Sequence, residues 1–181
     1  MATELIHLKS IKEADLSKKI ISNHCVVFIS PEEDYLPEVG STTNAGWDIK
    51  VDRLHETHSP SFYLLGTNVK YTIPPGYELQ LRLRSGTPKK YNFMLSNSVG
   101  TLDSNYRGEI LAGISPLDTV CEIPQPKTKF AQIILTNYFK PTLESHIIMN
   151  YYMITNKEEY DNWETILPTS RGKDGGIVRV K

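Results

Sequence analysis

The stretch Tyr77-Glu-Leu-Gln-Leu-Arg-Leu-Arg84 alternates apolar and polar residues over eight positions. Because successive side chains of a β-strand point to opposite faces, this alternation predicts a strand with one buried face. The residues on that face are Tyr77, Leu79, Leu81 and Leu83. Pro74-Pro-Gly76 comes directly before the strand and is a turn signal, since proline fixes φ and glycine accepts a positive φ. We therefore expect residues 67–73 to be the hairpin partner of this strand.

Further runs of β-branched or aromatic residues have the length of strands. They are residues 94–99, 109–114, 130–138 and 147–154. Eleven prolines and eleven glycines separate such runs, as expected for many short strands. The sequence thus predicts an all-β fold. Residues 6–21 and 156–167 carry apolar side chains near helical spacing, and each of these two stretches can be helical or not.

Length and composition favour one compact domain with extensions. The chain has 181 residues, which we divide into an N-terminal extension (1–24), a β domain (25–167) and a flexible, glycine-containing basic arm (168–181). Twenty Lys and Arg balance 21 Asp and Glu, so we expect no direct binding to nucleic acid and no membrane association. Only two cysteines, Cys25 and Cys121, and no signal-like segment predict an intracellular protein of the cytoplasm or nucleus, not a secreted one.

Four short segments combine glycine with charged or hydroxyl side chains. They are Ala45-Gly-Trp-Asp48, Arg84-Ser-Gly86, Gly100-Thr-Leu-Asp-Ser-Asn-Tyr-Arg-Gly108 and Arg171-Gly-Lys-Asp-Gly-Gly176. Each segment alone also fits a purely structural role. Arg84-Ser-Gly86 can simply end a strand, and Asp103-Ser-Asn105 can be a hairpin tip, because Asp and Asn bond their own backbone two residues on. The order of the segments along the chain carries more information than any one of them.

In that order, the segments resemble the motifs of the trimeric dUTP diphosphatases (dUTPases), a family with five ordered motifs on an all-β domain of the jelly-roll or β-clip type. The third segment is the most specific match. The fourth motif is represented only by Phe130-Ala-Gln132, with Lys127-Thr-Lys129 in place of the usual Gly-Asp-Arg. The fifth is represented only by its beginning, and Ile177 stands where an aromatic residue is expected.

The resemblance implies hydrolysis of dUTP to dUMP and pyrophosphate, which controls dUTP levels and supplies dUMP for thymidylate synthesis. Asp103 is the residue we expect to activate the water that attacks the α-phosphorus. Ser85 offers a hydroxyl, and Ser85 and Gly86 offer backbone N–H donors, that can bind phosphate oxygens and stabilise developing charge. Glycine at position 86 also admits a close approach of the phosphates.

Other residues carry over from the family as contacts to the nucleotide. The implied substrate-binding residues are Arg84, Ser85, Gly86, Asn97, Gly100, Leu102, Tyr106, Gln132, Arg171 and Gly172. The resemblance gives Asn97 to uracil and places Tyr106 against the deoxyribose. Tyr106 can instead be a cross-strand packing residue and Asn97 a turn residue. For Asp48 and Arg84, a structural ion pair is at least as good an interpretation as substrate contact.

The resemblance further implies Mg²⁺ as cofactor and a homotrimer whose subunits share each site. Magnesium prefers phosphate oxygens and water, so we expect no direct protein ligand. His55-Glu-Thr-His58 is interpreted as a surface loop and not as a metal site. Two other functions are alternatives: a deaminase on the same fold that uses Glu109, and a dUTPase-like regulatory protein with weak or no hydrolysis.

Overall fold

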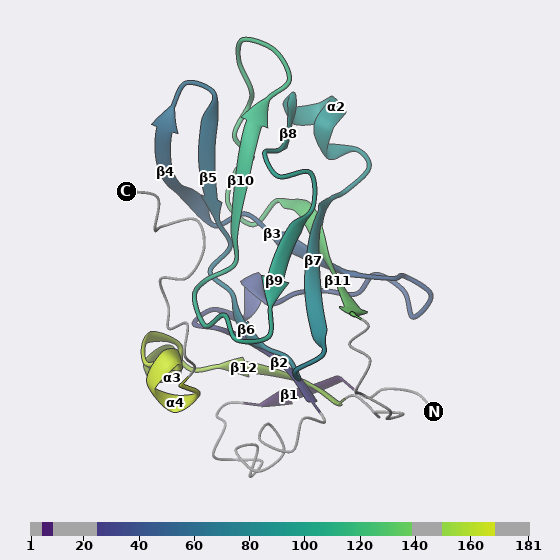
Figure 1. Ribbon diagram of the computed structural model, residues 1–181, viewed down its shortest axis with the longest axis vertical. Coiled ribbons are helices and arrows are strands. Elements are labelled where there is room, and N and C mark those ends of the chain that lie inside the picture. The colour runs from purple at the N-terminus through teal and green to yellow at the C-terminus, as the bar shows by residue number, and fades with distance from the viewer. Residues whose placement is uncertain (1–4, 9–24, 139–149, 169–181) are drawn as a thin grey trace.

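The computed structural model of the protein describes residues 5–8, 25–138 and 150–168 (Figure 1). Its strands form three four-stranded sheets. The first sheet has the order β1 (Leu5–Leu8), β12 (Asn150–Thr155), β2 (Cys25–Ser30) and β6 (Lys70–Thr72). The second has the order β4 (Arg53–Ser59), β5 (Phe62–Gly66), β10 (Leu111–Pro116) and β8 (Phe93–Leu95). The third has the order β3 (Trp47–Lys50), β11 (Lys129–Asn137), β7 (Tyr77–Leu83) and β9 (Gly100–Asp103).

Helices within these described residues are short. They are η2 (Glu33–Tyr35), α2 (Thr87–Tyr91), α3 (Lys157–Asp161) and α4 (Trp163–Ile166). None of them is long and apolar enough to cross a membrane. The prediction of a mostly β fold is therefore confirmed.

Strand β7 confirms the alternation that predicted it. Leu79 and Leu81 are buried, whereas Arg82, which directly follows Leu81, is exposed. The two leucines join a core cluster with Ile133 of β11 and Leu102 of β9, the strands on either side of β7. The opposite face of β7 carries Glu78, Gln80 and Arg82.

The predicted hairpin between residues 67–73 and β7 is wrong. The turn itself forms, because the Tyr77 amide donates to the Pro74 carbonyl at 3.3 Å and Gly76 has a φ of 90°. However, β6 pairs antiparallel with β2, and β7 pairs with β11 and β9. The turn therefore carries the chain from the first sheet to the third, and the partners of β6 are distant in sequence.

Other predicted runs form strands with shifted ends. The run 94–99 is a strand only up to Leu95, after which the Ser98 amide closes a turn onto the Leu95 carbonyl at 3.1 Å. The run 109–114 gives β10, which starts at Leu111 and continues to Pro116. The runs 130–138 and 147–154 give β11 and β12, although residues 139–149 lie outside the described part of the chain.

The two stretches with helical spacing differ in outcome. Residues 156–167 form α3 and α4, and the Asn156 side chain accepts from the Glu159 amide at 2.9 Å as an N-cap. In the N-terminal stretch, Leu5–Leu8 is a strand parallel to β12, and residues 9–24 lie outside the described residues. Tyr160 and Trp163 pack on Val27 and Ile29 of β2, so the helices cover one face of the first sheet (Figure 1).

Candidate active site

Asp103 is the last residue of β9 and begins a tight turn. In the strand register it lies opposite Glu78 of β7. The turn formed by residues 103–106, here called the Asp103 turn, is closed by the Tyr106 amide, which donates to the Asp103 carbonyl at 3.1 Å. The hydroxyl of buried Tyr71 donates to the same carbonyl at 2.8 Å. The backbone that carries the half-buried Asp103 is therefore held from two sides.

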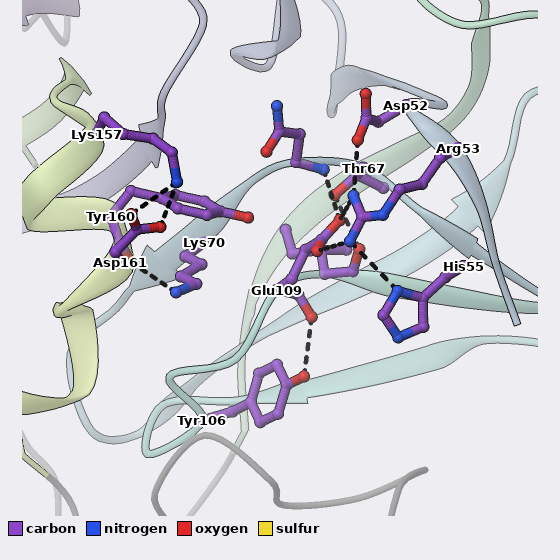
Figure 2. A network of polar contacts seen from close by, with 12 residues as sticks. Asp52, Arg53, His55, Thr67, Lys70, Tyr106, Glu109, Lys157, Tyr160 and Asp161 are labelled. Carbon is purple, nitrogen blue, oxygen red and sulfur yellow. Dashed lines mark hydrogen bonds and ion pairs between the residues drawn. The ribbon is translucent and has the colours of Figure 1, made fainter.

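Tyr106 packs inside the fold as well as facing the turn. Its ring lies 6.2 Å from the Tyr71 ring, and its hydroxyl donates to the Glu109 carbonyl at 2.8 Å (Figure 2). Tyr106 therefore has a packing role, but it follows β9 and Tyr71 belongs to β6 of another sheet, so the contact is not the cross-strand pair that the sequence allowed. A half-buried ring held at both ends presents a fixed surface beside the Asp103 turn.

Gly100 and Asn97 lie together at the start of β9. A Cβ at Gly100 would come within 3.1 Å of the Leu81 Cβ and 3.7 Å of the Asn97 side-chain nitrogen, so a larger residue would displace Leu81. Asn97 is exposed in the turn after β8. Leu102 is buried in the core and pairs with Leu79 of β7.

A cationic pocket lies at the other end of β7. Its volume is about 580 Å³, and Ser85 and Gly86 form part of its wall. The charged side chains that line it are Arg84, Lys90 and Lys129. A Cβ added at Gly86 would meet nothing within 4 Å, so this backbone borders open space. The pocket has the positive charge and open backbone that phosphate groups require.

Helix α2 and strand β11 fix the wall of this pocket. The buried Thr87 hydroxyl donates to the Phe130 carbonyl at 2.6 Å, and the Arg84 amide donates to the same carbonyl at 3.1 Å. Pro88 near the helix start has the fixed φ that suits a first turn. Asn92 ends the helix in the left-handed region at a φ of 57°.

Asp48 and Arg84 form the ion pair that the sequence left open. Arg84 Nε lies 3.1 Å from Asp48 Oδ1, and Lys129 Nζ lies 3.8 Å from Asp48 Oδ2. Glu38 Oε2 lies 2.6 Å from Lys129 Nζ, and Glu38 Oε1 forms a second ion pair with Lys50 Nζ. These two lysines hold the pKa of Glu38 below its ordinary value. Asp48 and Glu38 thus fix the positions of two cations that line the pocket.

Gln132 lies on β11 between the pocket wall and the outer sheet face. It is opposite Asp48 of β3 on one side and Arg82 of β7 on the other. Arg171 and Gly172 fall outside the described residues. The sequence-predicted residues therefore form two groups, one around Asp103 and one around Ser85, and Gln132 lies nearer the second.

The two groups are separated by the length of β7. Asp103 pairs with Glu78, next to the first residue of the strand, and Ser85 follows its last residue, Leu83, by two positions. At about 3.3 Å per residue, Glu78 and Leu83 are roughly 17 Å apart. Groups that act on one phosphate must each lie about 3 Å from it. One chain does not bring these groups together.

Three residues of the site region were missed by sequence reasoning. Lys90 and Tyr91 line the pocket, and the Lys89-Lys90 pair just after Arg84-Ser-Gly86 was a signal that could have found them. In the sequence, Arg107 stands out only as a part of the third motif. It is 8% exposed and donates to backbone carbonyls, and burial lowers its pKa. An arginine beside a glycine carries no sign in the sequence that it will be buried.

Glu109 is held by an arginine and by the backbone. Its Oε2 lies 2.6 Å from Arg53 Nη2 and its Oε1 accepts from Arg53 Nη1 at 3.1 Å (Figure 2). Oε1 also accepts from the Asn68 amide at 2.7 Å. A carboxylate with both oxygens engaged in this way is poorly placed to activate water. The arrangement argues against the deaminase alternative.

The interpretation of residues 55–58 as a loop is wrong, because they lie in strand β4. Exposed His55 lies 3.2 Å from Arg53 through its Nδ1. The register of β4 against β5 is irregular at Leu54/Glu56 and at Thr57/Ser59, which explains why the polar sequence gave no clear alternation. No group of three or more potential metal-ligating side chains occurs in the part of the chain that the structure describes.

The fold and these two groups define a mostly β protein with a cationic pocket and a separate turn that carries a carboxylate. The chain belongs to the dUTPase family, because the family model described as dUTPase matches residues 33–162, more than two thirds of its length. This match confirms the resemblance and the prediction of an enzyme of that class.

Curated relatives and solved structures agree with this assignment. The deoxyuridine 5′-triphosphate nucleotidohydrolase of Chlamydia caviae is 34% identical over 112 residues, covering 62% of this chain and 67% of the relative. The crystal structure of the dUTPase from Streptococcus mutans aligns with a TM-score of 0.55 and 26% identity, covering 63% of this chain and 92% of that one. The dUTPase of phage phi11 of S. aureus shares the fold at a TM-score of 0.51 and 20% identity, covering 67% and 95%.

Proposed function

We propose that the protein hydrolyses dUTP to dUMP and pyrophosphate, and so limits dUTP and supplies dUMP. The single observation that carries the proposal is the pairing of a backbone-held Asp103 turn with a separate cationic pocket at Arg84–Gly86, in a chain of the dUTPase family. The curated relative from Chlamydia caviae is named for this reaction.

Asp103 acts on the water that attacks the α-phosphorus. A carboxylate is a weak base, but it orients a water strongly through its acceptor oxygens. The Tyr71 hydroxyl and the Tyr106 amide hold the Asp103 backbone, which limits the directions in which the side chain can aim. Phosphoryl transfer depends mainly on such positioning and on charge stabilisation.

The cationic pocket receives the phosphates. Arg84 and Lys129 neutralise phosphate oxygens while Asp48 and Glu38 keep these cations in place. Ser85 and Gly86 contribute hydroxyl and backbone donors where a Cβ would meet open space. Lys129, where the family pattern has arginine, supplies charge without the planar fork of a guanidinium. Gln132 and, from the arm, Arg171 and Gly172 add further phosphate contacts.

The base and sugar lie against the start of β9 and the Asp103 turn. Asn97 and the backbone of Gly100 and Leu102 offer donors and acceptors to the edge of uracil. A Cβ added at Gly100 would come within 3.1 Å of the Leu81 Cβ, so a side chain at this position would disturb the edge that receives uracil. The ring of Tyr106 covers the deoxyribose and leaves no room for a 2′-hydroxyl.

A homotrimer completes each site. Asp103 and Ser85 lie too far apart along β7 to act on one triphosphate from the same chain. Closed symmetric rings repeat the same contact around an axis, so the Asp103 turn of one subunit faces the pocket of its neighbour at three equivalent sites.

Magnesium is proposed to enter with the triphosphate. Oxygen donors from phosphates and water suit this ion better than a cage of side chains. When bound there, the ion supplies charge neutralisation on the phosphate oxygens. The phage phi11 dUTPase is described with a structural Mg(II) ion, which motivates a titration of activity with Mg²⁺.

The direct test measures pyrophosphate release from dUTP beside dTTP, dCTP and UTP. Asp103→Asn should lower turnover by about 10² to 10⁴-fold, because it removes the charge that orients water, while dUTP binding is mostly kept. Asp118→Asn, in an exposed loop, is the matched control. Undiminished turnover in Asp103→Asn would overturn the assignment, and wild-type binding without turnover would favour the regulatory alternative.

A further inference from the structure

Helix α4 is connected to the Asp103 turn indirectly, through its buried Trp163 and through Tyr71 of β6. The indole N–H of Trp163 donates to the Tyr71 carbonyl at 3.1 Å. The Tyr71 hydroxyl then donates to the Asp103 carbonyl at 2.8 Å, and its ring lies beside that of Tyr106. Trp163 and Tyr71 are fully buried, so this connection runs through the interior of the molecule.

Arg107 makes a second connection between the same two parts. Its Nε donates to the Leu167 carbonyl, just after α4, at 3.0 Å. Its Nη1 donates to the carbonyls of Ser104 and Tyr106, at 2.8 Å and 2.9 Å. Burying a guanidinium is unfavourable unless its N–H groups are hydrogen-bonded. Here the Arg107 guanidinium donates to three backbone carbonyls. The side chain therefore fixes the turn relative to the end of α4.

The connecting residues Trp163 and Leu167 lie beyond the part of the chain that the family model matches, which ends at residue 162. The helices are themselves anchored, because Tyr160 packs on β2 and its carbonyl accepts from Lys70 Nζ at 2.6 Å. Lys70 also lies 4.2 Å from the centre of the Tyr160 ring. The segment is thus rigidly attached to the first sheet on one side and to the Asp103 turn on the other.

We propose that α3 and α4 form a brace that sets the position of the Asp103 turn, with Tyr71 and Arg107 as positioning residues. The brace holds the carbonyls of Asp103, Ser104 and Tyr106, and none of its bonds requires substrate. Its consequence for catalysis rests on the proposed function, because aiming a water at phosphorus tolerates little displacement.

Two variants separate the connections. Tyr71→Phe removes the hydroxyl bond to Asp103 and keeps the ring in the core, and Arg107→Met removes all three guanidinium bonds. Asp161→Asn, on the exposed side of α3, is the matched control in the same segment. Hydrogen exchange of residues 103–107 and 163–167 is followed together with the kinetics of dUTP hydrolysis.

Each variant should speed exchange in the Asp103 turn, and Arg107→Met should also speed it at residues 163–167. Turnover should fall roughly tenfold with KM changed by no more than about twofold, since position is lost and binding groups remain. Arg107→Lys, which keeps charge but not the fork, should recover only part of the loss.

Unchanged exchange in the turn of a folded Tyr71→Phe protein would overturn the brace, and this variant decides alone if Arg107→Met does not fold. Faster exchange with unchanged turnover would refute the positioning role. If the wild-type protein does not hydrolyse dUTP, the proposed function is rejected. Faster exchange in the variants would then still support the brace, so the two failures are distinguishable.

Discussion

Asp103 and Ser85 lie beside opposite ends of strand β7. Asp103 is paired with Glu78 near the first residue of the strand, and Ser85 follows two residues after Leu83. This separation keeps the two groups apart within one chain. It also makes the assembly of subunits a requirement of the proposed chemistry.

Lys90 should contribute to substrate binding although the motif pattern does not include it. Lys90 lines the cationic pocket, whereas the neighbouring exposed Lys89 is not among its lining residues. We expect Lys90→Gln to raise the KM for dUTP severalfold and to weaken its salt dependence, because one cation near the phosphates is lost. Lys89→Gln removes the same charge from the same helix and should leave KM unchanged. Equal effects of the two substitutions would argue against the pocket.

Stability at acid pH should depend on Glu38. Bonds to Lys129 and Lys50 lower the pKa of Glu38 from its ordinary value of 4.5. A carboxyl whose pKa is lower in the folded state stabilises the protein above the unfolded pKa, and this contribution disappears as pH falls through the folded pKa. Glu38→Gln should therefore destabilise the protein near pH 7 and show a shallower loss of stability below about pH 4.5 than wild type.

Thermal unfolding between pH 3 and pH 7 measures this difference. Glu33→Gln removes one exposed carboxylate from η2 and serves as the charge-matched control. Parallel pH profiles for wild type and Glu38→Gln would show that the lysine contacts add nothing to folded stability.

The Glu109–Arg53 pair should support the fold and not the chemistry. Glu109 is 11% exposed and binds both Arg53 and the Asn68 amide. Glu109→Gln should lower the free energy of unfolding by about 1–2 kcal/mol, because one charge-assisted bond is lost from a partly exposed pair. Asp161→Asn, in the exposed pair with Lys157, should cost less than about 0.5 kcal/mol.

Urea unfolding at one fixed protein concentration compares the two variants, since assembly makes stability depend on concentration. Turnover of folded Glu109→Gln should stay close to wild type. Complete loss of turnover in a stable Glu109→Gln protein would instead point to a chemical role for this carboxylate.

The sequence predicted those features that depend on local pattern. Alternation over Tyr77–Leu83 predicted β7 and its buried leucines, whereas apolar spacing over residues 156–167 left open whether α3 and α4 form. The pairing of β6 with β2 was missed because it joins residues more than forty positions apart, for which a nearby turn is no guide.

The site shows the same division. The motif pattern singled out Asp103 and Ser85 as candidate residues, and an ion pair of Arg84 with Asp48 was one of the two interpretations that the sequence allowed. The tertiary bonds of Tyr71, Arg107 and Trp163 could not be predicted, because a buried arginine or a shared carbonyl is created by packing between distant segments.

The central claim is that each site takes the Asp103 turn from one subunit and the cationic pocket from another. Gly86→Phe should fill the pocket without disturbing the backbone, because Gly86 has a φ of −83° and a Cβ there meets nothing within 4 Å. Asp103→Asn and Gly86→Phe should each be nearly inactive alone.

Pyrophosphate release by trimers assembled from equal amounts of these two variants is the most direct test. If the sites are shared, random assembly leaves both groups intact in about a quarter of them, and about a quarter of wild-type activity should return. Activity no greater than the sum of the two parent variants, in trimers shown to contain both chains, would contradict the account.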